Sequence, residues 1–183
     1  MKKTAFIIGL FVMVLSAGAQ TKYITKKGKI SFYSETSVEN IEAHNSRVSS
    51  ALDKESGKLE FVALITAFEF EKALMQEHFN ENYMESTKFP KSTFKGKITN
   101  IKDVDFTKDG VYNVNIEGDL TIHGVTKKIA EKGKITIKAG KISASSTFNI
   151  KLNDYGVKNP GGGKVSDDIK IVVDIQNYEP SKK

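Results

Sequence analysis

The alternation of apolar and polar residues from Tyr112 to Ile122 constrains the fold of this chain more than any other feature of its sequence. A period of two is typical of a β-strand with one buried and one solvated face. His123-Gly124 follows directly, and glycine adopts the positive φ of a hairpin turn at little cost. The sequence therefore predicts a long antiparallel hairpin. Its expected buried face carries Tyr112, Val114, Ile116, Gly118, Leu120 and Ile122.

Similar alternating segments recur along the chain, with turn residues such as Lys108-Asp109-Gly110 and Ala139-Gly140 between them. Many antiparallel strands in one domain are typical of a closed barrel or a sandwich. There is no internal repeat and no linker, so we expect one all-β domain over residues 20–183 with about eight strands. The expected strands are 22–25, 29–33, 44–52, 58–70, 93–101, 111–122, 127–138, 141–152 and 168–178.

One segment, residues 71–86, has helical rather than strand spacing. Leu74, Met75, His78, Phe79 and Tyr83 recur at intervals of three and four, which predicts a short amphipathic helix. The helix is expected to end before Phe89-Pro90, because a residue that precedes proline disfavours the helical region. Its polar face carries as much acid as base, which favours packing against the barrel over binding to a membrane.

The expected strand 58–70 is apolar on both faces. Phe61 and Ile65 share one face, and Leu64 and Phe68 share the other. A strand of this kind is normally covered on both sides. One side would face the interior, and the other would meet the helix or a second subunit. A homodimer formed through this strand is therefore a hypothesis that the sequence raises.

The amino terminus predicts export. Lys2 and Lys3 precede an apolar run at residues 5–15, and Ala17-x-Ala19 gives the small-residue spacing of a cleavage site. A bilayer span needs about 20 apolar residues, so the run is too short to anchor the protein stably in a membrane. We expect residues 1–19 to be a secretory signal peptide that is cleaved after Ala19. The chain has no cysteine, so no disulfide supports its fold.

Charge and motifs argue against several classes of function. The net charge is +6, but Arg47 is the only arginine and tryptophan is absent, which makes nucleic acid an unlikely partner. His44, His78 and His123 lie in different elements, and none has the spacing of a helical metal site. No serine lies in a nucleophile elbow. We expect no enzyme, no metal and no cofactor.

The interior positions allow two interpretations. Small residues stand among bulky ones at inward positions in the middle of strands, namely Gly96, Gly118, Gly133, Ala144 and Ser146. A barrel of about eight strands is either filled by side chains or able to hold one small ligand. Glycine also eases the coiling of strands, so both a filled barrel and an apolar cavity stay open. An apolar cavity with few polar groups suits a long hydrocarbon chain.

Several stretches together resemble the YceI-like family of periplasmic polyisoprenoid-binding proteins. The likeness runs from about the third strand to Tyr178 and keeps the family's order and spacing. It rests on Gly118–Lys128, on Phe79-Asn80 with Tyr83–Ser86, on Phe89–Phe94, on Ser145-x-x-Phe148-x-Ile150 with Asp154–Val157, and on Val165–Ile169. The resemblance implies a lipocalin-like antiparallel barrel in the periplasm that holds an isoprenoid or a related amphiphile.

The leading hypothesis is thus an exported protein that stores or carries a long apolar amphiphile of polyisoprenoid, quinone-like or fatty type. The alternative is a filled barrel that binds a protein partner and no small ligand. The polar head of a lipid would meet His78, or Lys158 and Lys164 of the long loop 153–167. The expected apolar lining is Phe61, Phe68, Met75, Phe79, Phe94, Tyr112, Ile116, Gly118, Leu120, Phe148 and Ile150.

Overall fold

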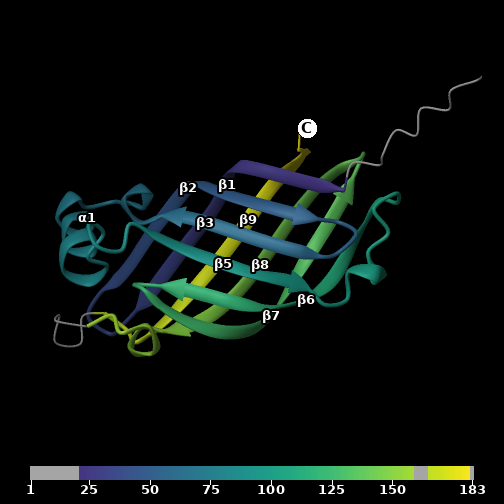
Figure 1. The fold of residues 1–183 in the computed structure, drawn as a ribbon. Helices are drawn as coiled ribbons and strands as arrows, with labels where there is room; N and C mark the ends of the chain where they lie inside the picture. The colour runs from purple at the N-terminus through teal and green to yellow at the C-terminus, as the bar shows by residue number, and fades with distance from the viewer. Residues whose placement is uncertain (1–20, 159–164, 182–183) are drawn as a thin grey trace, which may run out of the picture.

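Eight long antiparallel strands wind around one interior in the computed structural model, which describes residues 21–158 and 165–181 (Figure 1). The order around the sheet is β1-β9-β8-β7-β6-β5-β3-β2, and pairing of β1 with β2 closes the barrel. The ninth strand, β4, is a two-residue addition paired to β2. The strands are β1 (Lys22–Glu35), β2 (Asn40–Asp53), β3 (Lys58–Leu64), β4 (Glu69–Phe70), β5 (Lys91–Ile98), β6 (Gly110–Ile122), β7 (Val125–Lys138), β8 (Lys141–Lys151) and β9 (Asp168–Pro180).

The short helical elements divide between the two ends of the barrel. Four of them are single turns: 3₁₀ turns at η1 (Ile65–Ala67), η3 (Ile101–Asp103) and η4 (Leu152–Tyr155), and a π turn at η2 (Phe79–Tyr83). The α-helix, α1 (Ala73–His78), lies at the end that also holds η4 and the β6–β7 turn (Figure 1). We call this end the cap end. The opposite end, with η3 and the β7–β8 turn, is the far end.

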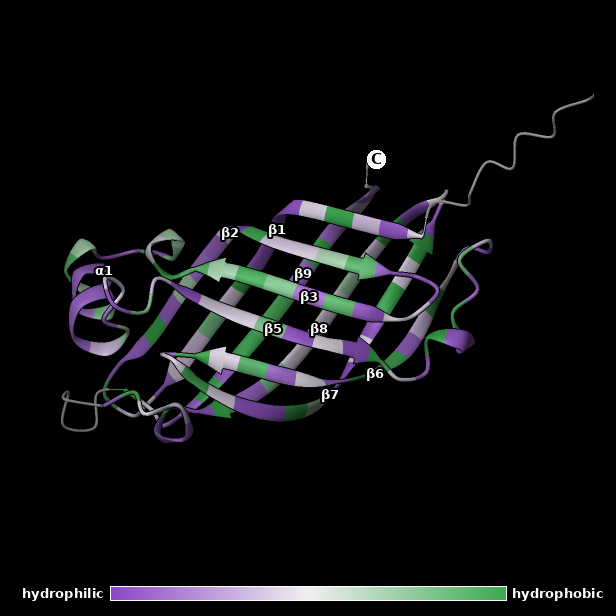
Figure 2. Ribbon diagram, in the orientation of Figure 1, coloured by the Kyte–Doolittle hydropathy of each residue, from purple (hydrophilic) through white to green (hydrophobic). Residues whose placement is uncertain are grey.

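The predicted hairpin is confirmed in full. β6 and β7 pair without interruption from Gly110 opposite Ile137 to Ile122 opposite Val125. His123 and Gly124 form the turn with φ values of 50° and 76°. Along the strands hydrophobic and hydrophilic residues alternate in bands (Figure 2). The closed antiparallel barrel with one short helix is the fold that the sequence predicts.

The first two expected strands are one strand in the structure. β1 runs from Lys22 to Glu35, and the residues between Thr25 and Ile30 form an irregularity in its pairing with β2. Gly28 lies in this irregularity and is buried. A Cβ atom there would come within 2.5 Å of Ile175 Cδ1. The turn-like run of lysine and glycine therefore marks a bulge over a crowded interior and not a break between strands.

The prediction for residues 58–70 is wrong in one respect. The strand ends at Leu64, whose carbonyl accepts a hydrogen bond from Asn45 Nδ2 at 2.9 Å, and η1 then resets the alternation. Phe68 consequently turns inward and is buried. Val62 and Leu64 keep the outer face and are 39% and 50% exposed. Within a single chain the outer face is therefore uncovered, and the homodimer stays a prediction.

The expected helix 71–86 is shorter and less regular than its spacing suggests. The α-helical part is six residues long, and the π turn that follows widens the coil, with Met84 N donating to Phe79 O at 2.9 Å. The wider turn keeps Phe79, Tyr83 and Met84 directed at the barrel. Leu74 is 61% exposed, so only part of the apolar face packs.

Gly96 and Gly118 are adjacent across β5 and β6, and the ring of Phe94 lies over both. A Cβ atom on Gly118 would lie 2.6 Å from Gly96 Cα, 2.6 Å from Lys95 O and 2.7 Å from Phe94 Cζ. Two of these three neighbours are backbone atoms, which have little room to move. The missing side chain at Gly118 thus provides space for the Phe94 ring and for close strand approach.

We predict that Gly118→Ala lowers the free energy of unfolding by about 3 kcal/mol, because overpacking against backbone is costly. Urea denaturation would measure the loss. Gly110→Ala is the control, since the nearest atoms to a Cβ there belong to the Tyr112 side chain, at 3.3 Å, and none is backbone. Equal and small effects of the two substitutions would contradict the crowding argument.

Tyr178 is buried inside the barrel, where its hydroxyl lies 2.7 Å from Ser50 Oγ. Ser50 Oγ also donates to Glu60 O at 2.9 Å, so the Tyr178 hydroxyl is the donor to Ser50. Burial raises the pKa of Tyr178 from 10.0 to about 12. The folded protein therefore keeps the phenol proton in a pH range where the unfolded chain loses it.

The free energy of unfolding is expected to fall as the pH rises from 10 to 12. A raised folded-state pKa stabilises the protein fully below the unfolded-state pKa, and the shift corresponds to about 2 to 3 kcal/mol. The Tyr178→Phe variant lacks this titrating group. Its own loss of stability between pH 10 and 12 measures the contribution of the lysines, which is then subtracted from the loss in the wild-type protein. If both proteins lost stability equally between pH 10 and 12, Tyr178 would not be the cause.

Candidate functional site

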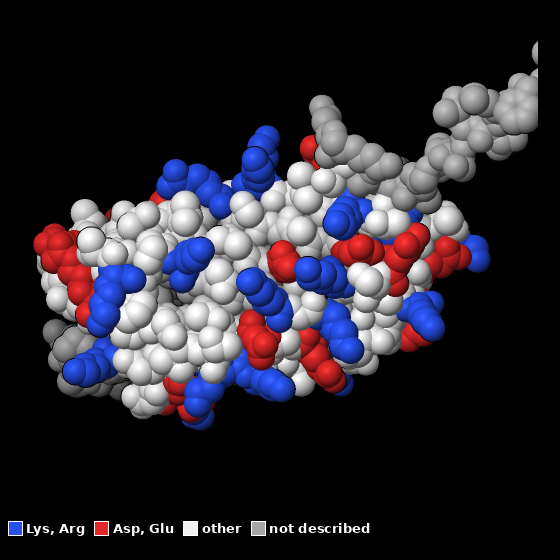
Figure 3. Space-filling model, in the orientation of Figure 1, with Lys and Arg blue, Asp and Glu red and all other residues white. Residues whose placement is uncertain are grey.

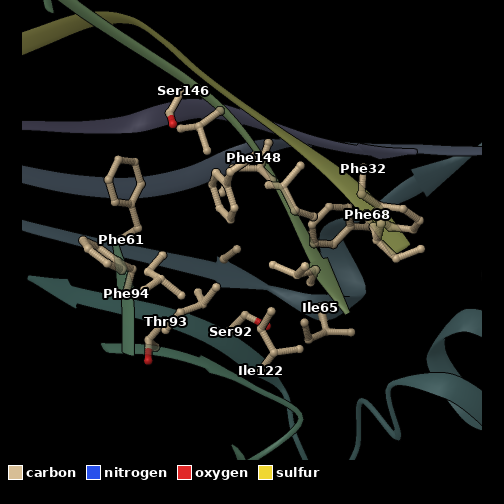
Figure 4. Close-up of a pocket in the computed structure, with 18 of the residues that line it drawn as sticks. Phe32, Phe61, Ile65, Phe68, Ser92, Thr93, Phe94, Ile122, Ser146 and Phe148 are labelled. Atoms are coloured by element: carbon tan, nitrogen blue, oxygen red, sulfur yellow. The ribbon is translucent and has the colours of Figure 1, made fainter. Parts of the chain in front are cut away.

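The interior of the barrel holds a cavity of about 560 Å³ that opens toward the cap end. This volume lies in the range of small-molecule pockets. Phenylalanines from several strands surround it, with Phe61 and Phe94 toward one side, Phe32 and Phe68 toward the other and Phe148 between them (Figure 4). The barrel is therefore not filled by its own side chains.

Four aromatic rings gather at the cap end of the cavity. Phe79 of the π turn lies 5.4 Å from Phe32, 5.7 Å from Phe68 and 5.0 Å from Phe70, measured between ring centroids. Such spacings are typical of favourable aromatic pairs. Because the other three rings come from β1, from β4 and from the residue between η1 and β4, this cluster attaches the helical cap to the barrel wall and gives the mouth an apolar rim.

The far end of the cavity is closed. Ile98, Ile135 and Tyr178 line its floor and are 3%, 1% and 3% exposed. Below them the core is completed by buried residues of η3 and its loop, including Ile101 and Val104. The cavity is thus a tube that is blind at the far end.

Most of the predicted apolar lining lies on the cavity wall. The residues found there are Phe61, Phe68, Met75, Phe79, Phe94, Ile116, Leu120, Phe148 and Ile150. Tyr112 and Gly118 do not line it. The Tyr112 hydroxyl donates toward Asp105 O and Lys108 O, both 3.1 Å away, which holds its ring at the far end. Gly118 is screened from the lumen by the Phe94 ring.

The predicted head-group residues are not gathered in one place. His78 is exposed and lines the mouth of the cavity beside Met75 and Phe79. Lys158 is exposed and does not line the cavity. Lys164 lies outside the described residues, as does the predicted signal peptide, residues 1–19.

Several charged or polar lining residues lie outside the predicted set, including Ser34, Glu39, Lys72, Ser92, Thr93, Glu131, Lys134 and Ser145. Glu131 stands on the inner face of β7 among Ile129, Gly133 and Ile135, and burial raises the pKa of its carboxyl group. Lys134 and Ser145 also line the cavity although they are exposed. The inward position of Glu131 follows from the period of two and was available in the sequence.

His123 lies in the β6–β7 turn, as the sequence predicts, but it is largely buried. Its side chain is only 10% exposed, and Nε2 lies 2.8 Å from Glu85 Oε2. The imidazole also lies against Phe89, with ring centroids 4.3 Å apart. Glu85 itself has a φ of 42°, an uncommon conformation for this residue type. His123 therefore connects the β6–β7 turn to the segment that follows the helical cap.

A second hydrogen-bonded histidine lies in the barrel wall. His44 Nδ1 is 2.7 Å from Ser31 Oγ, and His44 Nε2 is 2.7 Å from Glu42 Oε1. Ser31 is only 4% exposed, and none of the three residues lines the cavity. The serine is thus neither open to a substrate nor beside the pocket. The hydrogen bond between His44 and Ser31 has a structural role, because it joins β2 to β1.

Charged side chains and possible metal ligands are distributed along the described residues. Basic and acidic residues are interspersed on the face shown in Figure 3, with no continuous basic surface. Within residues 21–158 and 165–181, no cluster of three or more histidine, aspartate or glutamate side chains is placed to bind a metal. In the same part of the chain, no helix has the length and apolar character needed to cross a membrane.

A closed eight-stranded antiparallel barrel around an apolar, blind-ended cavity defines a lipocalin-like class of barrels, whose interior is able to hold one small ligand. Within this class, the sequence identifies the family. The model of the YceI-like domain matches residues 22–177, and the chain belongs to this family.

Curated relatives match the chain over part of their length. A UPF0312 protein of Pseudomonas savastanoi pv. phaseolicola is 30% identical over 98 residues, which cover 50% of this chain and 47% of the relative. Protein YceI of Shigella flexneri is 28% identical over 104 residues, covering 54% and 50%. The chain thus spans about half the length of the curated relatives that it matches.

Solved structures share the fold at low sequence identity. A polyisoprenoid-binding domain from Saccharophagus degradans, implicated in plant cell wall breakdown, superimposes with a TM-score of 0.74 at 12% identity, covering 89% of this chain and 100% of that one. The YceI protein of Campylobacter jejuni gives a TM-score of 0.60 at 21% identity, covering 81% and 90%.

Proposed function

We propose that this protein is an exported carrier or store for a long apolar amphiphile, of polyisoprenoid, quinone-like or fatty type, held in the barrel without covalent chemistry. The observation that carries the proposal is the apolar cavity of about 560 Å³. Each methylene group transferred from water to such a lining contributes about 0.8 kcal/mol, so a long chain needs few polar contacts. The polyisoprenoid-binding neighbour of the same fold supports this class of cargo.

Organic extraction of the purified protein followed by mass spectrometry tests the proposal. We expect an apolar amphiphile in an amount close to one per protein. Protein stripped of lipid is expected to take up a long-chain prenol from solution. If no amphiphile were recovered and the stripped protein took up none, the carrier function would be excluded.

Ala144→Phe is expected to weaken prenol uptake about tenfold. Ala144 lines the cavity, and the larger ring would displace about two methylene groups of the cargo, worth about 1.6 kcal/mol. Ala130→Phe is the matched control, because Ala130 lies on the neighbouring strand β7 and its side chain is exposed on the outer face of the barrel. Fluorescence titration would compare the two. Equal affinities would show that the chain does not pass Ala144.

The second candidate function is an interaction module, favoured by the exposed Val62 and Leu64 on β3. The same two residues would form the contact between the subunits of the homodimer. Sedimentation at micromolar concentration, with Val62→Thr as a variant, distinguishes the cases. A dimer that the variant disrupts supports the contact, and a monomer at every concentration removes it.

Export rests on the amino-terminal pattern of Lys2, Lys3 and Ala17-x-Ala19. Protein secreted into the periplasm is expected to begin at Gln20, and amino-terminal sequencing of the purified protein would check this. A mature chain that retained Met1 would contradict both cleavage and the periplasmic location.

A further inference from the structure

The hydrogen-bond ladder between β7 and β8 ends halfway along the two strands. Gly133 to Lys138 of β7 pair with Ser146 to Lys141 of β8. Closer to the cap end, residues 125–132 of β7 pair only with β6, and residues 147–151 of β8 pair only with β9. We call the gap between these two unpaired lengths the seam.

A side-chain hydrogen bond marks the start of the seam. Ser146 Oγ donates to Lys132 O at 2.6 Å, in the position where the next rung of the ladder would fall. At its other end the seam is bounded by η4, which packs with Val157 against Val125 at the start of β7. The opening is thus a defined window in the wall and not a frayed edge.

The cavity reaches the surface at this window. Lys134 and Ser145 face outward by strand alternation and are exposed, yet both line the cavity. Ile129 of β7 and Phe148 of β8 line the cavity on the two sides of the seam. Lys134 and Ser145 form the paired rung next to the last one before the seam, so their place in the lining supports an opening beside them.

Glu131 stands on the inner side of the window. Its carboxylate has no hydrogen bond or ion pair within the described residues, and its cross-strand neighbour on β6 is Ile116. Partial burial raises the pKa of this carboxyl group, and burial, followed by the charges of Asp154 and Glu131, raises the pKa of Tyr155 on η4. Glu131 is only partly buried, so water satisfies its carboxylate when no ligand is bound, and a donor on a ligand would take the place of that water.

We infer that the seam is the binding site for the polar head of the cargo, and that Glu131 accepts a hydrogen bond from an uncharged head that carries a hydroxyl group. The inference rests on the proposed carrier function. The apolar chain then lies in the tube between Phe148 and the far end. A head group bearing a phosphate or carboxylate is disfavoured, because it would place a second negative charge beside Glu131. Lys134 is exposed, so water screens its compensating attraction.

Competition binding with two ligands of the same chain length, farnesol and farnesyl monophosphate, tests the inference. Each displaces a fluorescent long-chain alcohol probe, which carries no charge, from lipid-free protein. We expect the wild-type protein to prefer the alcohol. Glu131→Gln removes the charge while keeping an acceptor, so the ratio of alcohol affinity to phosphate affinity is expected to fall about tenfold.

Glu117→Gln is the matched control, because it removes the same charge from the outward face of β6, where Glu117 is the cross-strand neighbour of Ala130. His78→Gln tests the mouth as the alternative place for the head group. An unchanged ratio in Glu131→Gln, or a larger change in His78→Gln, would overturn the assignment. Displacement by neither ligand would instead refute the carrier function itself.

A second measurement does not depend on the Glu131 variant. Since the chain has no cysteine, Ser145→Cys gives a single site for an environment-sensitive fluorophore at the edge of the seam. Its emission is expected to change when farnesol is bound. A label at Asn113→Cys, which is exposed on the neighbouring β6, should not respond. Equal responses of the two labels would contradict a head group in the seam.

Discussion

The pairing of β1 with β2 is the contact on which the rest of the structure depends. It joins the first element of the chain to the strand that follows, while β1 also pairs with the last strand, β9, so the sheet has no free edge around most of its circumference. Closure forces every inward side chain into one enclosed space. The cavity, its aromatic lining and its blind far end are consequences of that closure combined with strict alternation along each strand.

The ladder between β7 and β8 is incomplete near the cap end, and Glu131 lines the cavity from the unpaired length of β7. Elsewhere an inward carboxylate would be sealed in an apolar wall. The position of Glu131 is compatible with a stable fold because water or a ligand reaches it through the seam. The same region is bordered by η4 and, beyond the β6–β7 turn, by the His123–Glu85 contact.

Strand alternation predicted the fold and most of the lining because burial in a two-faced strand depends only on local position. The predictions failed where a residue's role depends on a distant partner. The bulge at Gly28 is set by Ile175, and the roles of Gly118 and His123 are set by Phe94 and by Glu85 with Phe89. The π turn and the η1 turn depend on packing against the barrel, which no local pattern encodes. Glu131 differs from these residues. The period of two places its side chain inward, but a charged residue was not expected on an apolar wall.

The closed far end limits how a bound molecule exchanges. A tube that was open at both ends could receive cargo at one side and release it at the other. In this barrel, Ile98, Ile135 and Tyr178 obstruct through-passage, so entry and exit share one end. If the protein carries a lipid as proposed, a donor and an acceptor would use the same end of the barrel in turn. Under the proposed carrier function, loading and release would therefore be two separate encounters at the cap end, where both the mouth and the seam lie.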